Sequence, residues 1–240
     1  MAFSSKVTSV TCTSIALLVS ACATSSQTDP AKLTLDEDNE KSAVVVKLSG
    51  KNVNYFGVNS LSIIQYSEEA ARNKPDRPPV KDSSRFIDLE YKLNTGGFTV
   101  AEVPPGTYFL ARGNMPKKWA GCFNKNTVKF EVVPNKITYM GDINLDEFYT
   151  EMTAAMNAYE GDKLGKIDYD ILLIDERFSG PKNFKNNLTF VPKFENSNPQ
   201  NHQDVSDFLT KNGASVKVPV TDAKFEPISF PLGKDGCAQQ

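Results

Sequence analysis

The chain's single histidine limits the chemistry that its side chains can perform. His202 lies in a polar stretch, residues 198–204 (NPQNHQD). A serine hydrolase would need this imidazole beside a serine on a strained turn, and the sequence has no G-x-S-x-G motif. One imidazole also excludes a histidine-rich metal site. We therefore predict that His202 is a solvated loop residue before a helix, without a catalytic role.

Carboxylate pairs offer another route to acid–base chemistry, at Asp168 and Asp170 and again at Asp175 and Glu176. A glycosidase needs two carboxyl groups facing each other across a cleft, one of them partly desolvated. Asp168 and Asp170 instead alternate with apolar residues, which is typical of the solvent side of a strand. The acidic run at residues 36–40 lacks the spacing and glycine of an EF-hand, which favours a solvated linker over a calcium loop. These patterns predict no enzyme, no metal and no cofactor.

Residues 114–126 (NMPKKWAGCFNKN) contain the only tryptophan of the chain. An aromatic side chain among lysines in a loop can stack on a sugar or contact a protein partner. We therefore name Trp119, Lys117, Lys118 and Phe123 as candidate binding residues. The alternative interpretation is that Trp119 covers the end of a hydrophobic core.

The charge balance excludes one class of partner. The sequence has 27 Lys and Arg against 29 Asp and Glu and no basic run, so we predict no nucleic-acid binding. Its 240 residues, 40% of them hydrophobic, are enough for one domain with a sizeable core.

The N-terminus indicates the compartment. Residues 7–19 are uncharged and end in an apolar run that is too short to span a membrane, which is typical of a secretory signal. Residues 19–22 (VSAC) resemble a bacterial lipobox, in which the cysteine, here Cys22, becomes the first mature residue and carries acyl chains. Among bacterial proteins with a lipobox, an alanine at the second mature position, here Ala23, resembles the pattern of those sent to the outer membrane. The alternative is an ordinary signal that is cleaved after Ala23.

The composition divides the chain into three parts. We predict a lipoprotein signal peptide at 1–21, a flexible tether at 22–42 and a single domain at 43–240. The tether is polar and has no periodic apolar pattern. We predict a helical insertion near 145–160, where apolar residues recur at a helical period, and an extended C-terminal part.

The pattern of the domain predicts a series of short strands. Apolar and polar residues alternate, or apolar residues run together, between turns rich in Pro, Gly and Asn, which predicts a mainly β fold, an antiparallel sandwich with one or two short helices. The predicted strands are 43–48, which should be central, 60–66, 85–93, 98–103, 107–111, 127–133, 137–143, 167–174, 188–191, 215–220 and 225–230. A long loop is predicted at 68–84 and a short helix at 205–209. Pro219 and Pro227 place one of the last strands at an edge.

Two of these strands meet at Pro104, Pro105 and Gly106, the corner around which the domain is organised. Pro105 has the fixed φ that suits the second position of a type II turn. Gly106 can take the positive φ of the third position, and we predict that it does so.

This corner resembles a known family. Residues 98–100 (FTV) and 103–110 (VPPGTYFL), followed by 130–132 (FEV) and 139–143 (YMGDI), are similar to transthyretin-like (prealbumin-like) sandwich modules. Carboxypeptidase regulatory domains and a group of small bacterial lipoproteins share this pattern. The resemblance covers about residues 43–145 and implies the fold but no catalytic residue, because the module has none. The predicted helix from Leu145 and the tail after Gly180 depart from it.

The remaining cysteines suggest a disulfide. Cys12 leaves with the signal and Cys22 is taken by lipid, which leaves Cys122 and Cys237 in an oxidising compartment. We predict a bond between them. The alternative is two separate thiols.

These observations favour a non-enzymatic structural or protein-interaction module, anchored by lipid to the outer membrane of a bacterial envelope and facing the periplasm. Its partners would be the membrane, through Cys22, and another envelope protein or a glycan. The first alternative is a glycan- or peptidoglycan-binding module that uses Trp119. The second is an envelope hydrolase.

Overall fold

The computed structural model describes residues 28–38, 40–50, 60–115, 119–123, 127–147, 150, 194 and 199–230. Some of the features predicted above lie outside these ranges. They are the signal peptide, Cys22, Cys237, Lys117, Lys118, the two carboxylate pairs, and the strands at 167–174 and 188–191. Residues 145–147 and 150 are helical, and the rest of the helix predicted near 145–160 also lies outside.

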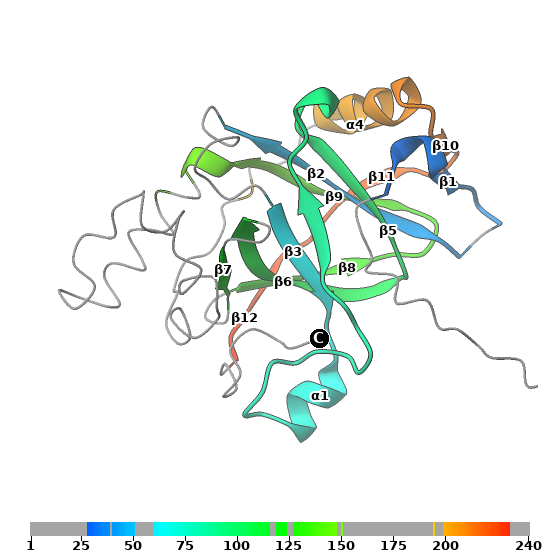
Figure 1. Cartoon of the computed structure of the whole chain (residues 1–240). Helices are drawn as coiled ribbons and strands as arrows, with labels where there is room; N and C mark the ends of the chain where they lie inside the picture. The colour runs from blue at the N-terminus through cyan, green and yellow to red at the C-terminus, as the bar shows by residue number, and fades with distance from the viewer. Residues whose placement is uncertain are drawn as a thin grey trace, which may run out of the picture.

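The described residues form two large sheets that pack face to face and a third sheet of only two short strands (Figure 1). The four-stranded sheet has the order β11 (Val220–Asp222), β9 (Ile137–Asn144), β2 (Ser42–Ser49) and β5 (Phe98–Val103). The six-stranded sheet has the order β12 (Glu226–Ile228), β8 (Thr127–Val132), β6 (Gly106–Met115), β3 (Ser60–Gln65) and β4 (Ile87–Glu90), with β7 (Trp119–Cys122) paired to β6. The mainly β fold with few short helices is thus confirmed.

Strand pairing differs between the two sheets. Every pair in the six-stranded sheet is antiparallel, as is β2 with β5. In the four-stranded sheet β9 runs parallel to both of its neighbours, β2 and β11. The predicted antiparallel pairing therefore holds except around β9. β11 and β12 lie at sheet edges, in agreement with Pro219 before one and Pro227 within the other, since proline cannot donate to a ladder.

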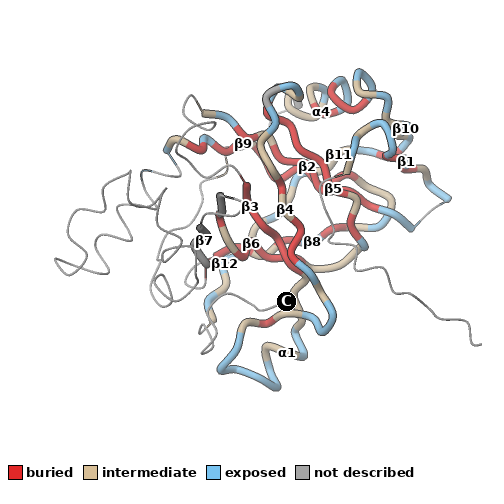
Figure 2. The backbone as a smooth tube through the Cα atoms, in the orientation of Figure 1, coloured by how far each residue is buried: buried red, intermediate tan, exposed pale blue. Residues whose placement is uncertain are grey.

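The position of β2 between two cores explains why its sequence is apolar at nearly every position. Val44 and Val46 face the core between the sheets, whereas Ala43 and Val45 face a second core on the other side. A strand that is buried on both faces has no solvent side, so its apolar residues run together instead of alternating. Figure 2 shows this burial as a continuous red tube through the central strands. The predicted central position of this strand is confirmed.

The second core lies on the outer face of the four-stranded sheet, beneath α4 (Pro199–Lys211) and the small parallel pair of β1 (Thr34–Leu35) and β10 (Ser215–Val216). Phe208 of α4 stacks on Phe98 of β5, with ring centroids 5.1 Å apart and planes 19° from parallel. The helix predicted at 205–209 is therefore present and longer than expected. Gly213 follows it with φ +83°, a conformation that favours glycine.

The predicted tether extends too far along the chain. Leu33 and Leu35 are fully buried in the second core, and β1 pairs with β10. The segment from Thr28 onward is therefore part of the folded domain. Its sequence is polar overall because only two of its side chains face the core.

A third, smaller core covers the outer face of the six-stranded sheet. It packs Phe109 of β6 and Phe86 beneath the segment after α1 (Glu68–Asn73), with Val80 from that segment and Phe230 from the chain's last described residues. The loop predicted at 68–84 thus begins with a short helix, whose first N–H groups are capped by Ser67. The strand predicted at 85–93 is shortened to β4.

The predicted corner joins the two sheets, because β5 belongs to one and β6 to the other. Gly106 has φ +144°, so the predicted positive φ is confirmed, although the angle is wider than the about +80° of a type II turn. Tyr108 is 1% exposed, and its hydroxyl donates to the carbonyl oxygen of Pro104 at 2.8 Å. A tyrosine that bonds back to the main chain in this way also fixes the corner of other β-sandwiches.

Candidate functional site

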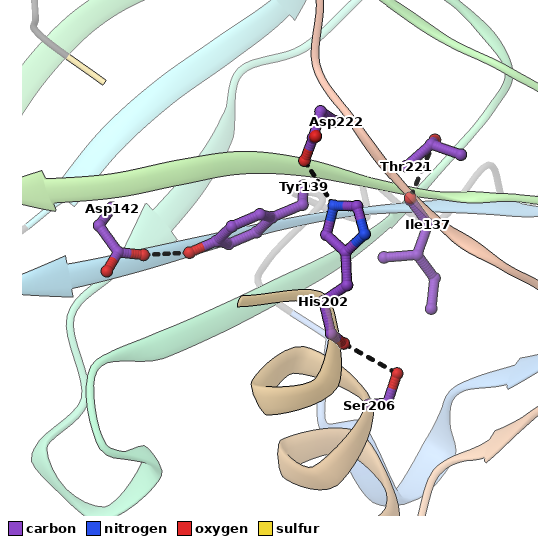
Figure 3. Close-up of polar contacts among 7 residues, drawn as sticks. All are labelled: Ile137, Tyr139, Asp142, His202, Ser206, Thr221 and Asp222. Atoms are coloured by element: carbon purple, nitrogen blue, oxygen red, sulfur yellow. Dashed lines mark hydrogen bonds and ion pairs between the residues drawn. The ribbon is translucent and has the colours of Figure 1, made fainter. Parts of the chain in front are cut away.

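Four polar side chains gather where α4 meets the four-stranded sheet, and Figure 3 shows them together. We call Tyr139, Asp142, His202 and Asp222 the α4 polar cluster. Tyr139 and Asp142 lie on β9, Asp222 lies on β11 and His202 lies in the first turns of α4. The cluster contains the residue types of acid–base chemistry, so its geometry decides whether it can react or only holds the elements together.

His202 is bonded to Asp222. Its Nε2 donates to Oδ1 of the carboxylate at 2.6 Å, and the two side chains are 33% and 45% exposed. The prediction of a solvated loop residue is therefore wrong: His202 is helical and pairs with the edge strand. Sequence reasoning missed this pair because the partner carboxylate lies beyond the end of α4, on a strand that the helix itself covers.

Tyr139 is the most buried member of the cluster, at 1% exposed. Its hydroxyl donates to the carboxylate of Asp142, which also pairs with Lys47 at 3.3 Å. Burial raises the pKa of Tyr139, and the hydrogen bond to Asp142 and the negative charges of Asp142, Asp204 and Asp222 raise it further. The phenol therefore keeps its proton at neutral pH and acts as a donor, not as a base or nucleophile.

The hydroxyl groups beside the histidine are directed to the main chain (Figure 3). Ser206 donates to the carbonyl oxygen of His202 at 3.0 Å, and Thr221 donates to that of Ile137 at 3.3 Å. A nucleophile would instead be hydrogen-bonded to the imidazole. Within the described ranges no group of three His, Cys, Asp or Glu residues is placed to hold a metal ion. The bond of His202 to Asp222 thus connects α4 to β11, the bond of Tyr139 to Asp142 lies within β9, and both are structural contacts.

A second polar group crosses three strands of the six-stranded sheet. Asp88, Ser62 and Arg112 stand in one cross-strand row on β4, β3 and β6. The Ser62 hydroxyl donates to the carboxylate of Asp88, and Nε of Arg112 donates to Oγ of Ser62 at 2.9 Å. The guanidinium lies 3.5 Å from the carboxylate and 3.9 Å from the ring centre of Phe86. The alternation of apolar and polar residues along β4 predicts that Asp88 lies on the outward face. Its contacts with Ser62 and Arg112 depend on the register between the strands, which the sequence does not specify.

Of the candidate binding residues around Trp119, the structure describes the main chain of Trp119 and the whole of Phe123, whereas Lys117 and Lys118 lie outside the described ranges. The main chain of residues 119–122 forms β7, which pairs with the end of β6 so that Trp119 stands opposite Met115. This part is a strand and not a loop. Phe123 is 1% exposed and packs in the core between the sheets, so its assignment as a binding residue is wrong. Its apolar character is explained by burial.

Comparison with known proteins leaves the function to be argued from the residues themselves. No protein-family model matches the chain, and no curated protein matches it. Among solved structures, a leucine-rich repeat protein from Bacteroides thetaiotaomicron is similar over 50% of this chain and 16% of that chain. The identity is 13% and the TM-score is 0.23, and a likeness this weak supports neither a fold nor a function.

Proposed function

We propose that this protein is a bacterial envelope lipoprotein that is anchored in the outer membrane through acylated Cys22. Its β-sandwich would serve as a non-enzymatic structural or protein-interaction module on the periplasmic face. The observation that carries this proposal is the sequence of residues 19–22 (VSAC) after an uncharged stretch. Several acyl chains on one cysteine would hold the protein stably, because a single chain binds a membrane only marginally.

The contacts of the described polar groups support a structural role rather than catalysis. In the α4 polar cluster the bond of His202 to Asp222 joins a helix to a strand, and the row of Asp88, Ser62 and Arg112 joins three strands. The hydroxyl groups of Ser62 and Tyr139 bond to carboxylates, and that of Ser206 bonds to a main-chain carbonyl. The corner at Gly106 and Tyr108 also supports the proposed transthyretin-like kind of sandwich, since it joins the two sheets at the place where the motif lies. None of the helices in the described ranges is both long and apolar enough to cross a membrane.

Acylation can be tested with two cysteine variants in a bacterial host. Cys22→Ser should abolish incorporation of radiolabelled palmitate and release the protein from the membrane fraction or leave it as an uncleaved precursor. Cys12→Ser is the matched control, because Cys12 lies within the predicted signal and should leave labelling unchanged. Normal labelling of the Cys22→Ser protein would refute the proposed anchor.

A second candidate function is glycan or peptidoglycan binding through Trp119, the only tryptophan, which follows two lysines. Its fluorescence reports on this one position, so titration with soluble peptidoglycan fragments tests the idea directly. A saturable change in emission that is lost after Lys117→Gln and Lys118→Gln would support it. Emission that does not respond to any fragment would remove this candidate.

A further inference from the structure

We infer that the side of the sandwich formed by η1 (Pro30–Lys32), β1 and the edge of β5 lies directly against the phospholipid headgroups. This inference rests on the proposed acylation of Cys22. It adds the orientation of the domain relative to the membrane. The structure shows where the anchored segment joins the domain, and the sequence shows how short that segment is.

The junction is fixed by two hydrogen bonds at the edge of β5. The main-chain N–H of Thr28 donates to the carbonyl oxygen of Val100 at 2.9 Å. The N–H of Glu102 donates in turn to the hydroxyl of Thr28 at 2.7 Å. Thr28 thus occupies edge groups that would otherwise be open to solvent or to another strand. The chain is held to the domain from this residue onward.

The contacts that follow Thr28 prevent this segment from detaching easily. Asp29 caps η1 through a 3.1 Å bond from the N–H of Ala31. Leu33 and Leu35 are fully buried beneath α4. Detaching the segment would return both leucine side chains to water, which the hydrophobic effect opposes. The folded domain therefore begins no later than Thr28, well before the boundary at residue 42 that composition alone suggests.

The length of chain between the anchor and this junction limits how far the domain can stand from the membrane. Thr28 and Cys22 are 28 − 22 = 6 residues apart. Six residues span about 20 Å at full extension, and about 13 Å on average as a flexible coil. A folded domain of about 200 residues is about 40 Å across. The domain is thus wider than its tether is long and cannot turn its far side to the membrane.

Figure 1 shows which parts lie near the junction and which lie far from it. η1 and β1 lie beside α4 and β10 on one side of the molecule, whereas α1 lies at the opposite end. We therefore expect the α1 end to face away from the lipid and to be the part accessible to a periplasmic partner.

The charges near the junction indicate that the tether, and not electrostatic attraction, holds the domain at the membrane. Exposed acidic residues outnumber basic ones there, and the charged groups include the ion pair of the exposed Lys41 with the half-buried Glu102 at 3.0 Å. The others are Asp29, Lys32, Glu37, Asp38 and Glu40. This excess of negative charge gives anionic lipid no net attraction, so the orientation that the tether sets should persist at high salt.

Short-range quenching in vesicles tests the orientation. A fluorescent amino acid is placed at position 32 in η1 or at position 72 in α1, both occupied by exposed basic residues. The full acylated protein is reconstituted into vesicles of phosphatidylethanolamine and phosphatidylglycerol that carry a headgroup spin label. We expect quenching at position 32 to exceed that at position 72 several-fold, in low and in high salt. Equal quenching, or stronger quenching at position 72, would overturn the inference.

Two further measurements separate this inference from the proposed anchor. Insertion of about twenty Gly and Ser residues before Thr28 should abolish the difference between the two positions while the protein stays bound to the vesicles. A difference that persists with the long tether would show that the short tether does not set the orientation. Protein that fails to float with the vesicles would refute the acylation, and the orientation with it.

Discussion

The four-stranded sheet buries its outer face under α4, β1 and β10, whereas the six-stranded sheet covers its outer face with the segment after α1 and with Phe230. Within the described residues, the first cover buries twelve hydrophobic side chains and the second only four. Hydrophobic stabilisation scales with the apolar area removed from water. We infer that the α4 side is part of the cooperative fold and that the opposite cover can open more easily.

The two faces also differ in their polar contacts. On the four-stranded sheet, His202 and Asp222 join the covering helix to the sheet beneath it. On the six-stranded sheet, Asp88, Ser62 and Arg112 join strands of the same sheet to one another. The comparison indicates that polar bonds fix the position of the cover on one face and the strand register on the other.

Truncating one aromatic side chain in each cover should give the largest contrast. Phe208→Ala removes a ring that is 7% exposed and stacks on Phe98, so we expect a loss of about 3–5 kcal/mol in the free energy of unfolding. Phe230→Ala removes a half-buried ring and should cost about 1–2 kcal/mol. Urea unfolding measures both. The exposed Thr210→Ala on α4 is the control, and a loss below about 1 kcal/mol for Phe208→Ala would contradict the proposed difference.

Glycine positions in the two sheets should differ for a steric reason. A Cβ on Gly97, which has φ +86°, would lie 2.1 Å from the carbonyl oxygen of Leu48, a main-chain atom of β2. A Cβ on Gly106 would meet only the end of the Gln65 side chain, at 2.8 Å. We expect Gly97→Ala to cost about 3 kcal/mol or more and Gly106→Ala about 1–2 kcal/mol.

The neighbouring Gly96 provides a matched control. It also has a positive φ, +64°, but an added Cβ would meet nothing within 4 Å. Gly96→Ala should therefore cost only about 1 kcal/mol of backbone strain. Equal melting temperatures for Gly96→Ala and Gly97→Ala would show that the close approach to β2 is relieved by a small shift of the chain.

High pH should destabilise the sandwich through Tyr108. Burial raises the pKa of Tyr108 to about 12, above its ordinary value of 10.0. Because the folded state holds this proton more tightly than the unfolded chain, the contribution is fully present below pH 10 and is lost as pH rises from 10 to 12. The slope for one such group is about 1.4 kcal/mol per pH unit.

Tyr108→Phe tests this effect, and the unfolding free energy of the same variant at neutral pH is the control. At pH 7 the variant should lose about 1 kcal/mol, because the hydrogen bond to Pro104 is absent. Above pH 10 its unfolding free energy should fall less steeply than that of the wild type. Tyr139, whose pKa is also raised, contributes a loss of the same sign, so the double variant should have the flattest profile. Parallel profiles for wild type and Tyr108→Phe would contradict the prediction.

The smallest effects should come from exposed polar contacts. His202→Gln removes a hydrogen bond to a partly exposed carboxylate and should cost about 1 kcal/mol or less. Hydrogen exchange should show the loss mainly in the amides of α4, because the bond holds the cover and not the sheet. Lys41→Gln breaks an ion pair whose side chains are 52% and 32% exposed and should change stability by less than about 0.5 kcal/mol. A larger effect for Lys41→Gln than for His202→Gln would reverse this order.

The sequence predicts a strand correctly where the apolar pattern within one short stretch shows which faces of that strand are buried. Continuous apolar character in β2, and alternation in β8, are visible in the sequence because each pattern follows from which faces of a strand are covered. The periodic apolar residues of α4 gave its position in the same way. The corner was found because proline and glycine restrict the main chain locally.

The missed features depend on contacts between distant parts of the chain. Leu33 and Leu35 are only two apolar residues in a polar stretch, and their burial requires β10 from near the end of the chain. The pairing of His202 with Asp222 requires the exact placement of α4 on β11. Phe123 could be read equally well as a binding residue or as a core residue, because an aromatic side chain suits both environments.

The position of β2 has a consequence for the order in which the chain folds. β2 is the first long strand to be synthesised, yet it lies at the centre of its sheet, where Val44 pairs with Ala101 on one side and Thr138 on the other. Neither ladder can form until those later residues are available, and closing such long loops before any contact forms slows folding. An emerging chain would therefore keep this apolar segment unpaired until residues more than 50 positions later have been made. If the protein is exported as we propose, this delay would keep the chain unfolded while it is threaded through a secretion channel.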